Sequence, residues 1–106
     1  MGTVYLIQNN DDNLYKIGVT KGDANTRLRK LQTGNPHQLK LISTYESKYP
    51  FRLESFLHNK FRMYNILNEW YDLPKEIVEN FHDECERMNC IIISLKDNYF
   101  FRKKLK

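Results

Sequence analysis

The sequence of 106 residues predicts a small α/β sandwich in which a three-stranded antiparallel sheet is flanked by about three helices. Short runs of β-branched and aromatic residues, which strands prefer, are separated by turn-forming residues. Longer segments place apolar residues at helical spacing. The length fits one domain, which we expect over residues 1–101, followed by a basic C-terminal tail at residues 102–106.

The first two predicted strands form a β-hairpin. Residues 3–8 are β-branched and aromatic, residues 9–13 (NNDDN) are turn formers, and residues 14–20 return as the second strand. Gly18 inside that strand indicates a bulge or a close approach to the backbone. A third strand is expected over residues 38–46, where side chains alternate between two faces.

Two helices are expected within the first two thirds of the chain. The first spans residues 23–33 and begins at a cap formed by Asp23 or Asn25. The second spans residues 51–64, with Pro50 at its start and an apolar arc along one side.

The last third of the chain is harder to divide. Residues 69–73 are extended and aromatic, and a third helix is expected over residues 74–89. Residues 91–101 are either a last strand or a continuation of that helix, and their β-branched run favours a strand.

Charge is distributed unevenly along the chain. Residues 14–62 carry ten Lys or Arg against three acidic residues, whereas residues 63–101 carry three against eight. A phosphate backbone would be attracted to the basic half. Charge alone is equally compatible with two ordinary solvated faces.

The composition also limits location and partners. No apolar run approaches the roughly 18 residues of a membrane span, and no basic and apolar leader opens the chain. Cys85 and Cys90 lack the spacing of a zinc site, so we expect two reduced thiols. We therefore expect an intracellular protein, in a bacterium or a virus-infected cell, without a membrane partner.

Four residues of the N-terminal half have the chemistry needed to hydrolyse a phosphodiester: Tyr5, Lys16, Arg27 and Glu54. One carboxylate can anchor a divalent ion that keeps most of its waters, and an arginine can bond two phosphate oxygens at once. A tyrosine or lysine of lowered pKa can take a proton from water. Taken singly, each residue also has an ordinary structural role, and a helical carboxylate commonly pairs with a neighbouring base.

In this order, the motifs resemble those of the GIY-YIG nuclease superfamily. Thr3-Val4-Tyr5 stands where the first triplet belongs, and Lys16-Ile17-Gly18 stands where the second belongs. Arg27 matches the arginine of the following helix, and Glu54 in RLESFLHNKF matches the metal-binding glutamate.

Further features are similar to a small viral and bacterial branch related to a phage T5 open reading frame and a yeast meiotic gene product. They are YKIGVT, RLRKLQTGNP, the E-x-x-x-H helix and the stretch Glu69-Trp70-Tyr71-Asp72. The resemblance covers residues 3 to about 73. The chain departs from the pattern at Lys16, where a tyrosine is usual, and at Leu31, where many members have a histidine. The asparagine that some members place after the glutamate is either Asn65 or Asn68.

The resemblance implies a metal-dependent endonuclease that acts on nucleic acid, with DNA as the expected substrate, by a one-metal mechanism. Glu54 would hold one Mg²⁺ or Mn²⁺, Tyr5 would orient or deprotonate the water, and Lys16 and Arg27 would bind the scissile phosphate. We expect Tyr15 and His58 to position the substrate. Flanking phosphates would meet three further cations, Lys21, Arg29 and Lys30.

Two alternatives stay open. The first is a catalytically weak or inactive nucleic-acid-binding domain of the same fold, which the departures at Lys16 and Leu31 allow. The second is a protein-interaction module that uses the acidic third helix. Because the sequence shows no added DNA-binding module, we expect weak sequence specificity or a partner protein that supplies it.

Overall fold

The computed structural model describes residues 1–97. Its elements, in chain order, are β1 (Gly2–Asn9), β2 (Leu14–Thr20), α1 (Ala24–Gln32), β3 (Leu39–Ser47), α2 (Pro50–Lys60), the 3₁₀ helix η1 (Arg62–Tyr64), β4 (Asn65–Leu67), β5 (Trp70–Tyr71), α3 (Lys75–Glu79) and α4 (Phe81–Asp97). None of the described helices is long and apolar enough to cross a membrane.

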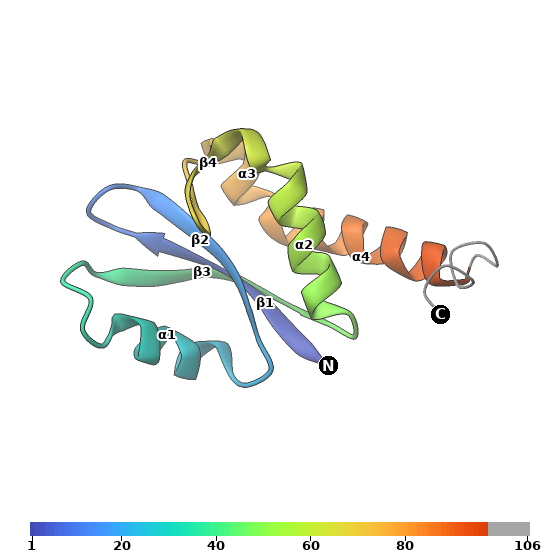
Figure 1. Ribbon diagram of the computed structural model, residues 1–106, viewed down its shortest axis with the longest axis horizontal. Coiled ribbons are helices and arrows are strands. Elements are labelled where there is room, and N and C mark those ends of the chain that lie inside the picture. The colour runs from blue at the N-terminus through green and yellow to red at the C-terminus, as the bar shows by residue number, and fades with distance from the viewer. Residues whose placement is uncertain (98–106) are drawn as a thin grey trace.

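The sheet has five strands in the order β3-β1-β2-β5-β4, and every neighbouring pair is antiparallel. The α/β class is confirmed, but the prediction of three strands is wrong. The two additional strands, β4 and β5, contain three and two residues, too few to produce a visible alternation of side chains. Helix α1 covers one face of the sheet, while α2 and α4 lie on the other (Figure 1).

The β1–β2 hairpin forms as expected, and its register explains Gly18. Tyr5 lies opposite Gly18, and a Cβ atom added to this glycine would overlap the Tyr5 ring, 2.7 Å from Cε1. Gly18 therefore marks a close approach of a side chain. The one irregularity of β1 faces β3 instead, where the register shifts between Leu6 and Ile7.

Local signals placed the ends of α1 correctly. The side chain of Asp23 accepts a hydrogen bond from the Thr26 amide at 3.0 Å, so Asp23, rather than Asn25, is the N-cap. Two residues beyond the helix, Gly34 has a φ of +77°, which favours glycine. Pro50 is the first residue of α2. That helix ends at Lys60, four residues earlier than expected, because the chain tightens into η1.

The C-terminal third differs from the prediction in two ways. The helix expected over residues 74–89 is divided into α3 and α4 at Asn80. Residues 91–97 continue α4, so the prediction of a strand there is wrong. Ile92 packs with Phe81 and Cys85 in the core, which overrides the strand preference of its β-branched side chain. Residues 98–101 of that prediction and the tail at 102–106 lie outside the described residues.

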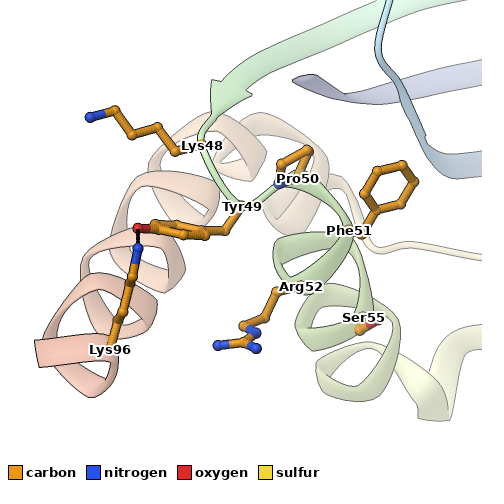
Figure 2. Close-up of a pocket in the computed structure, with 7 residues that line it drawn as sticks. All are labelled: Lys48, Tyr49, Pro50, Phe51, Arg52, Ser55 and Lys96. Atoms are coloured by element: carbon orange, nitrogen blue, oxygen red, sulfur yellow. Dashed lines mark hydrogen bonds between the residues drawn. The ribbon is translucent and has the colours of Figure 1, made fainter. Parts of the chain in front are cut away.

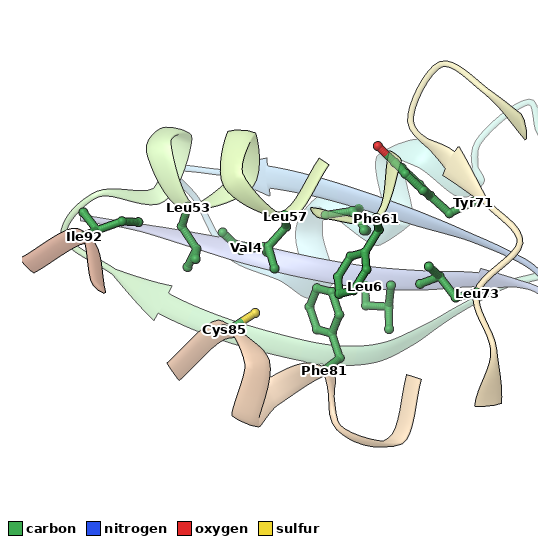
Figure 3. Close-up of a cluster of buried hydrophobic side chains, with 11 residues drawn as sticks. Val4, Leu6, Leu53, Leu57, Phe61, Tyr71, Leu73, Phe81, Cys85 and Ile92 are labelled. Atoms are coloured by element: carbon green, nitrogen blue, oxygen red, sulfur yellow. The ribbon is translucent and has the colours of Figure 1, made fainter. Parts of the chain in front are cut away.

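Two apolar clusters hold the layers together. The larger one lies between the sheet and helices α2 and α4 (Figure 3) and contains Val4, Leu6, Ile17, Leu53, Leu57, Phe61, Tyr71, Leu73, Phe81, Cys85 and Ile92. The smaller one lies under α1, where Tyr5, Ile7 and Leu39 meet Leu28, Leu31, Leu41 and Trp70. Successive residues of β2 therefore face different helices: Ile17 points to α2, whereas Lys16 and Gly18 share the α1 face with Tyr5.

Candidate metal and phosphate site

The candidate site lies where β5 stops covering the edge of β2. Strand β5 pairs with Tyr15 and Lys16, and the Ile17 amide donates a hydrogen bond to the Glu69 carbonyl at 3.3 Å. Beyond that bond, no described strand pairs with the outer edge of β2. Glu69, which directly precedes β5, is thereby brought close to α2 although it lies 15 residues after Glu54.

Three side chains form a cluster at this edge: Glu54, His58 and Glu69. One ligand atom from each lies within 4.8 Å of the other two. Glu54 and His58 are four residues apart on α2, with His58 Nε2 3.8 Å from Glu54 Oε2. The other ring nitrogen of His58, Nδ1, hydrogen bonds the Tyr71 hydroxyl on β5, which holds the ring in this orientation.

The cluster concentrates negative charge in a half-buried position. The Glu54 side chain is 17% exposed. Burial raises its pKa, the nearby Glu69 charge raises it further, and His58 and Lys16 oppose these effects without cancelling them. A bound cation would relieve the cost of ionising Glu54.

The Lys16 ammonium faces the cluster. Its Nζ atom lies 2.5 Å from Glu69 Oε2, and the side chain is 13% exposed. The same ammonium lies 5.8 Å from the centre of the Trp70 ring. Lys16 is therefore held between a carboxylate and an aromatic face.

Tyr5 and Glu54 come from opposite sides of the sheet. Tyr5 is 2% exposed and belongs to the α1-side cluster, whereas Glu54 is on the helix that covers the other face. No hydrogen bond or ion pair joins Tyr5 to the three-residue cluster within residues 1–97. Lys16 links the two sides, because it is a diagonal cross-strand neighbour of Tyr5 and also contacts Glu69.

Arg27 lies on the first turn of α1 and is half-buried. Within residues 1–97 its guanidinium has no acidic partner, so an anion would satisfy its donors. The three cations predicted to contact flanking phosphates are all exposed. Lys21 lies 5.7 Å from the centre of the Phe51 ring, and Arg29 Nη2 donates to Thr26 Oγ1 at 3.3 Å.

Tyr15 faces α2 and lies directly across from Tyr71, the partner of His58. The sequence assigned no site role to Glu69, Trp70 or Tyr71, although the stretch that contains them was noted as a family feature. The structure gives each a contact with a predicted site residue: Glu69 and Trp70 with Lys16, and Tyr71 with His58.

The donor set fits a divalent metal ion. Carboxylate oxygens suit Mg²⁺ and Mn²⁺, and an imidazole nitrogen is tolerated by Mn²⁺ better than by Mg²⁺. The geometry thus provides a cluster that can hold a cation, with Lys16 at its border. Arg27 lies on a different helix, α1, and has no acidic partner among residues 1–97.

The comparisons with known proteins add a family assignment. The family model described as the T5orf172 domain matches residues 2–86, which include all the site residues discussed above. Comparison with curated proteins and with solved structures gave no significant match. The chain belongs to the T5orf172 domain family.

Proposed function

We propose that this domain is a divalent-metal-dependent endonuclease of the GIY-YIG type that hydrolyses phosphodiester bonds in nucleic acid, with DNA as the substrate. The observation that carries the proposal is the cluster of Glu54, His58 and Glu69, whose ligand atoms lie within 4.8 Å of one another. The family supports it, since T5orf172 domains are nuclease-like and DNA-binding in character.

In the proposed site, Glu54 is the principal ligand of one Mg²⁺ or Mn²⁺, and His58 and Glu69 are the further ligands. A bound divalent ion would supply positive charge to the phosphate and to the leaving oxygen. The Tyr71 hydroxyl hydrogen bonds Nδ1 of His58 and so fixes the orientation of that ring. The imidazole favours Mn²⁺ over Mg²⁺ as the better activator.

The remaining predicted residues act on the phosphate and the water. Arg27, whose guanidinium has no acidic partner within residues 1–97, bonds the oxygens of the scissile phosphate. Lys16 contributes a second positive charge to the same phosphate. Tyr5, which the resemblance to GIY-YIG nucleases marks as the group that orients or deprotonates the attacking water, would act from the α1 side of the sheet, where its ring packs against Gly18 and Lys16 is its diagonal neighbour. Sequence preference is expected to be weak unless a partner protein supplies it.

The test is Glu54→Ala, measured by plasmid nicking, by Mn²⁺ titration and by DNA binding in EDTA. We expect nicking with Mn²⁺ to fall at least about 100-fold and Mn²⁺ affinity to drop, because the principal ligand is lost. DNA binding should persist or tighten, since a negative charge has been removed from the surface that meets phosphates.

Glu79→Ala is the matched control. Glu79 is an exposed glutamate of α3. Its Oε1 atom lies 3.8 Å from Lys75 Nζ, and an exposed ion pair of this length contributes little to stability. The variant should leave nicking and Mn²⁺ binding unchanged. If Glu54→Ala nicks DNA as well as the wild type does, the proposed catalytic site is wrong.

A second candidate function is nucleic-acid binding without cleavage, and the Lys16–Glu69 ion pair favours it. This ammonium already neutralises one carboxylate of the cluster and would compete with a metal ion for it. Salt-dependent DNA binding by a wild-type protein that cuts with no metal would select this alternative. If the protein shows no salt-dependent DNA binding, the remaining alternative is that the domain is a protein-interaction module.

A further inference from the structure

A second surface on α2, separate from the carboxylate cluster, has the composition of a ligand site. It is a pocket of about 630 Å³ between the start of α2 and the end of α4, and its lining includes Lys48, Tyr49, Phe51, Arg52, Ser55 and Lys96. Among the described residues, three cations and no carboxylate line it. Figure 2 shows Arg52 extending from α2 toward α4, with Lys96 and Tyr49 joined on the opposite side.

Both aromatic rings of this pocket, Tyr49 and Phe51, lie close to a lysine ammonium. The Lys96 ammonium bonds the Tyr49 hydroxyl and lies 4.5 Å from the centre of that ring. Phe51 is 53% exposed, and the Lys21 ammonium lies 5.7 Å from the centre of its ring. A basic surface that also offers an exposed aromatic face is typical of sites for single-stranded nucleic acid, where phosphates meet cations and an unpaired base stacks on a ring.

The pocket adjoins the candidate metal site. Phe51 and Ser55 are three residues before Glu54 and His58, respectively, on the surface of α2. Side chains at this spacing lie about 5–6 Å apart between Cβ atoms, so a strand that passes the carboxylate cluster also reaches the pocket.

We propose that this basic and aromatic pocket binds an unpaired strand of nucleic acid next to the scissile phosphate. Lys48, Arg52 and Lys96 hold backbone phosphates, and Phe51 stacks on one unpaired base. The proposal rests on the proposed function, because the nuclease assignment places the scissile phosphate next to the bound strand. It also specifies a substrate class, because a paired base does not expose its face for stacking. The domain would thus prefer substrates that are single-stranded beside the cleavage site.

The experiment measures fluorescence anisotropy of a labelled oligonucleotide, single-stranded or in a duplex, in EDTA so that no cleavage occurs. Phe51→Ala should weaken single-strand binding about three- to tenfold and leave duplex binding nearly unchanged. Lys48→Gln and Arg52→Gln should weaken both, and each should reduce the single-strand salt slope by about 0.7. Lys48 is exposed, which makes its variant informative even if Arg52→Gln fails to fold.

Two controls remove equivalent groups from elsewhere on the surface. Lys75→Gln deletes a positive charge from α3, and Leu67→Ala deletes an exposed apolar side chain from β4. Both should bind like the wild type. Equal loss of single-strand and duplex binding in Phe51→Ala would overturn the stacking assignment, and wild-type binding by Lys48→Gln and Arg52→Gln would overturn the pocket.

The two proposals can fail separately. If the wild type cuts DNA but the pocket variants bind and cut like it, the nuclease assignment stands and the pocket is wrong. If no metal supports cutting but the pocket variants lose single-strand affinity, the pocket stands and the nuclease assignment is wrong.

Discussion

Lys16 stands where the resemblance to GIY-YIG nucleases would place a tyrosine, and its ammonium faces a carboxylate. It contacts Glu69 and also lowers the pKa of Glu54, although burial outweighs that effect. In Lys16→Met the cluster loses one positive charge. We expect its affinity for Mn²⁺ to rise about tenfold, which corresponds to ~1.4 kcal/mol of screened charge interaction.

The measurement is Mn²⁺ titration followed by electron paramagnetic resonance or calorimetry. Nicking activity of Lys16→Met should fall even though the metal binds more tightly, because the phosphate also loses a cation. Lys40→Met, which removes an exposed lysine of β3, should change neither quantity. Unchanged or weaker Mn²⁺ binding in Lys16→Met would show that this lysine does not compete for the cluster.

For single residues, the sequence predicted contacts between residues that are close along the chain but not contacts between distant ones. Glu54 and His58 could be paired in advance because four residues separate neighbours on a helix. Glu69 could not be added to them, because its position depends on the pairing of β5 with β2, which involves only two residues of β5. The role of Lys16 also changed, since its partners Glu69 and Trp70 are both more than fifty residues away.

Between elements, the clearest polar connection joins α2 to α4. Lys60 and Arg87 both form ion pairs with Glu84, whose side chain is 11% exposed. Burial alone would raise the pKa of Glu84, but the hydrogen bonds and charges of Lys60 and Arg87 outweigh it, so the pKa lies below its ordinary value. The folded state therefore favours the ionised form of Glu84.

We predict that Glu84→Gln lowers the free energy of unfolding by about 1–2 kcal/mol at neutral pH. A carboxyl whose pKa is lowered by folding contributes its full stabilisation of the folded state at pH values above its unfolded pKa of about 4.3. This contribution is lost as the pH falls through the folded pKa. Urea titrations from pH 7 to pH 3 should show the two proteins converging at the acidic end. Glu79→Gln, at an exposed pair, should match the wild type throughout. A difference that did not shrink at all between pH 7 and pH 3 would exclude loss of the charge as its cause.

Secondary structure was predictable where its signals are local. The Asn-rich turn, the Asp23 cap and the proline at the start of α2 are decided within a few residues. The strand predicted over residues 91–101 was wrong in its described part because packing of Ile92 against α2 and the sheet outweighs propensity.

For the whole molecule, the two cysteines of α4 offer a measure of global opening. Cys85 is fully buried and Cys90 is exposed. Burial, with a smaller effect of the Glu84 charge, raises the pKa of the Cys85 thiol to about 12. A thiol reagent at pH 8 should therefore react rapidly with one thiol per chain, and with the second only at the rate of unfolding.

The raised pKa also predicts an alkaline loss of stability. Because the folded state holds the Cys85 proton more tightly than the unfolded state, the contribution is complete below about pH 8.5. It falls as pH rises toward 12, by up to about 1.4 kcal/mol per pH unit. Cys85→Ala should lack this part of the decline, whereas Cys90→Ser should keep it and lose the fast thiol. Two rapidly reacting thiols in the wild type would contradict the buried position of Cys85.

The sequence by itself determined the α/β class, the hairpin, the caps and the family, because these depend on short-range patterns and on motifs in a fixed order. Only the tertiary structure decided that Glu69 joins Glu54 and His58, that Lys16 bridges the two sides of the sheet, and that α2 and α4 enclose a basic pocket. Each of these contacts joins residues that are distant along the chain and lie on different elements. Such contacts form only when strand register and helix packing are fixed together, and no local pattern encodes that combination.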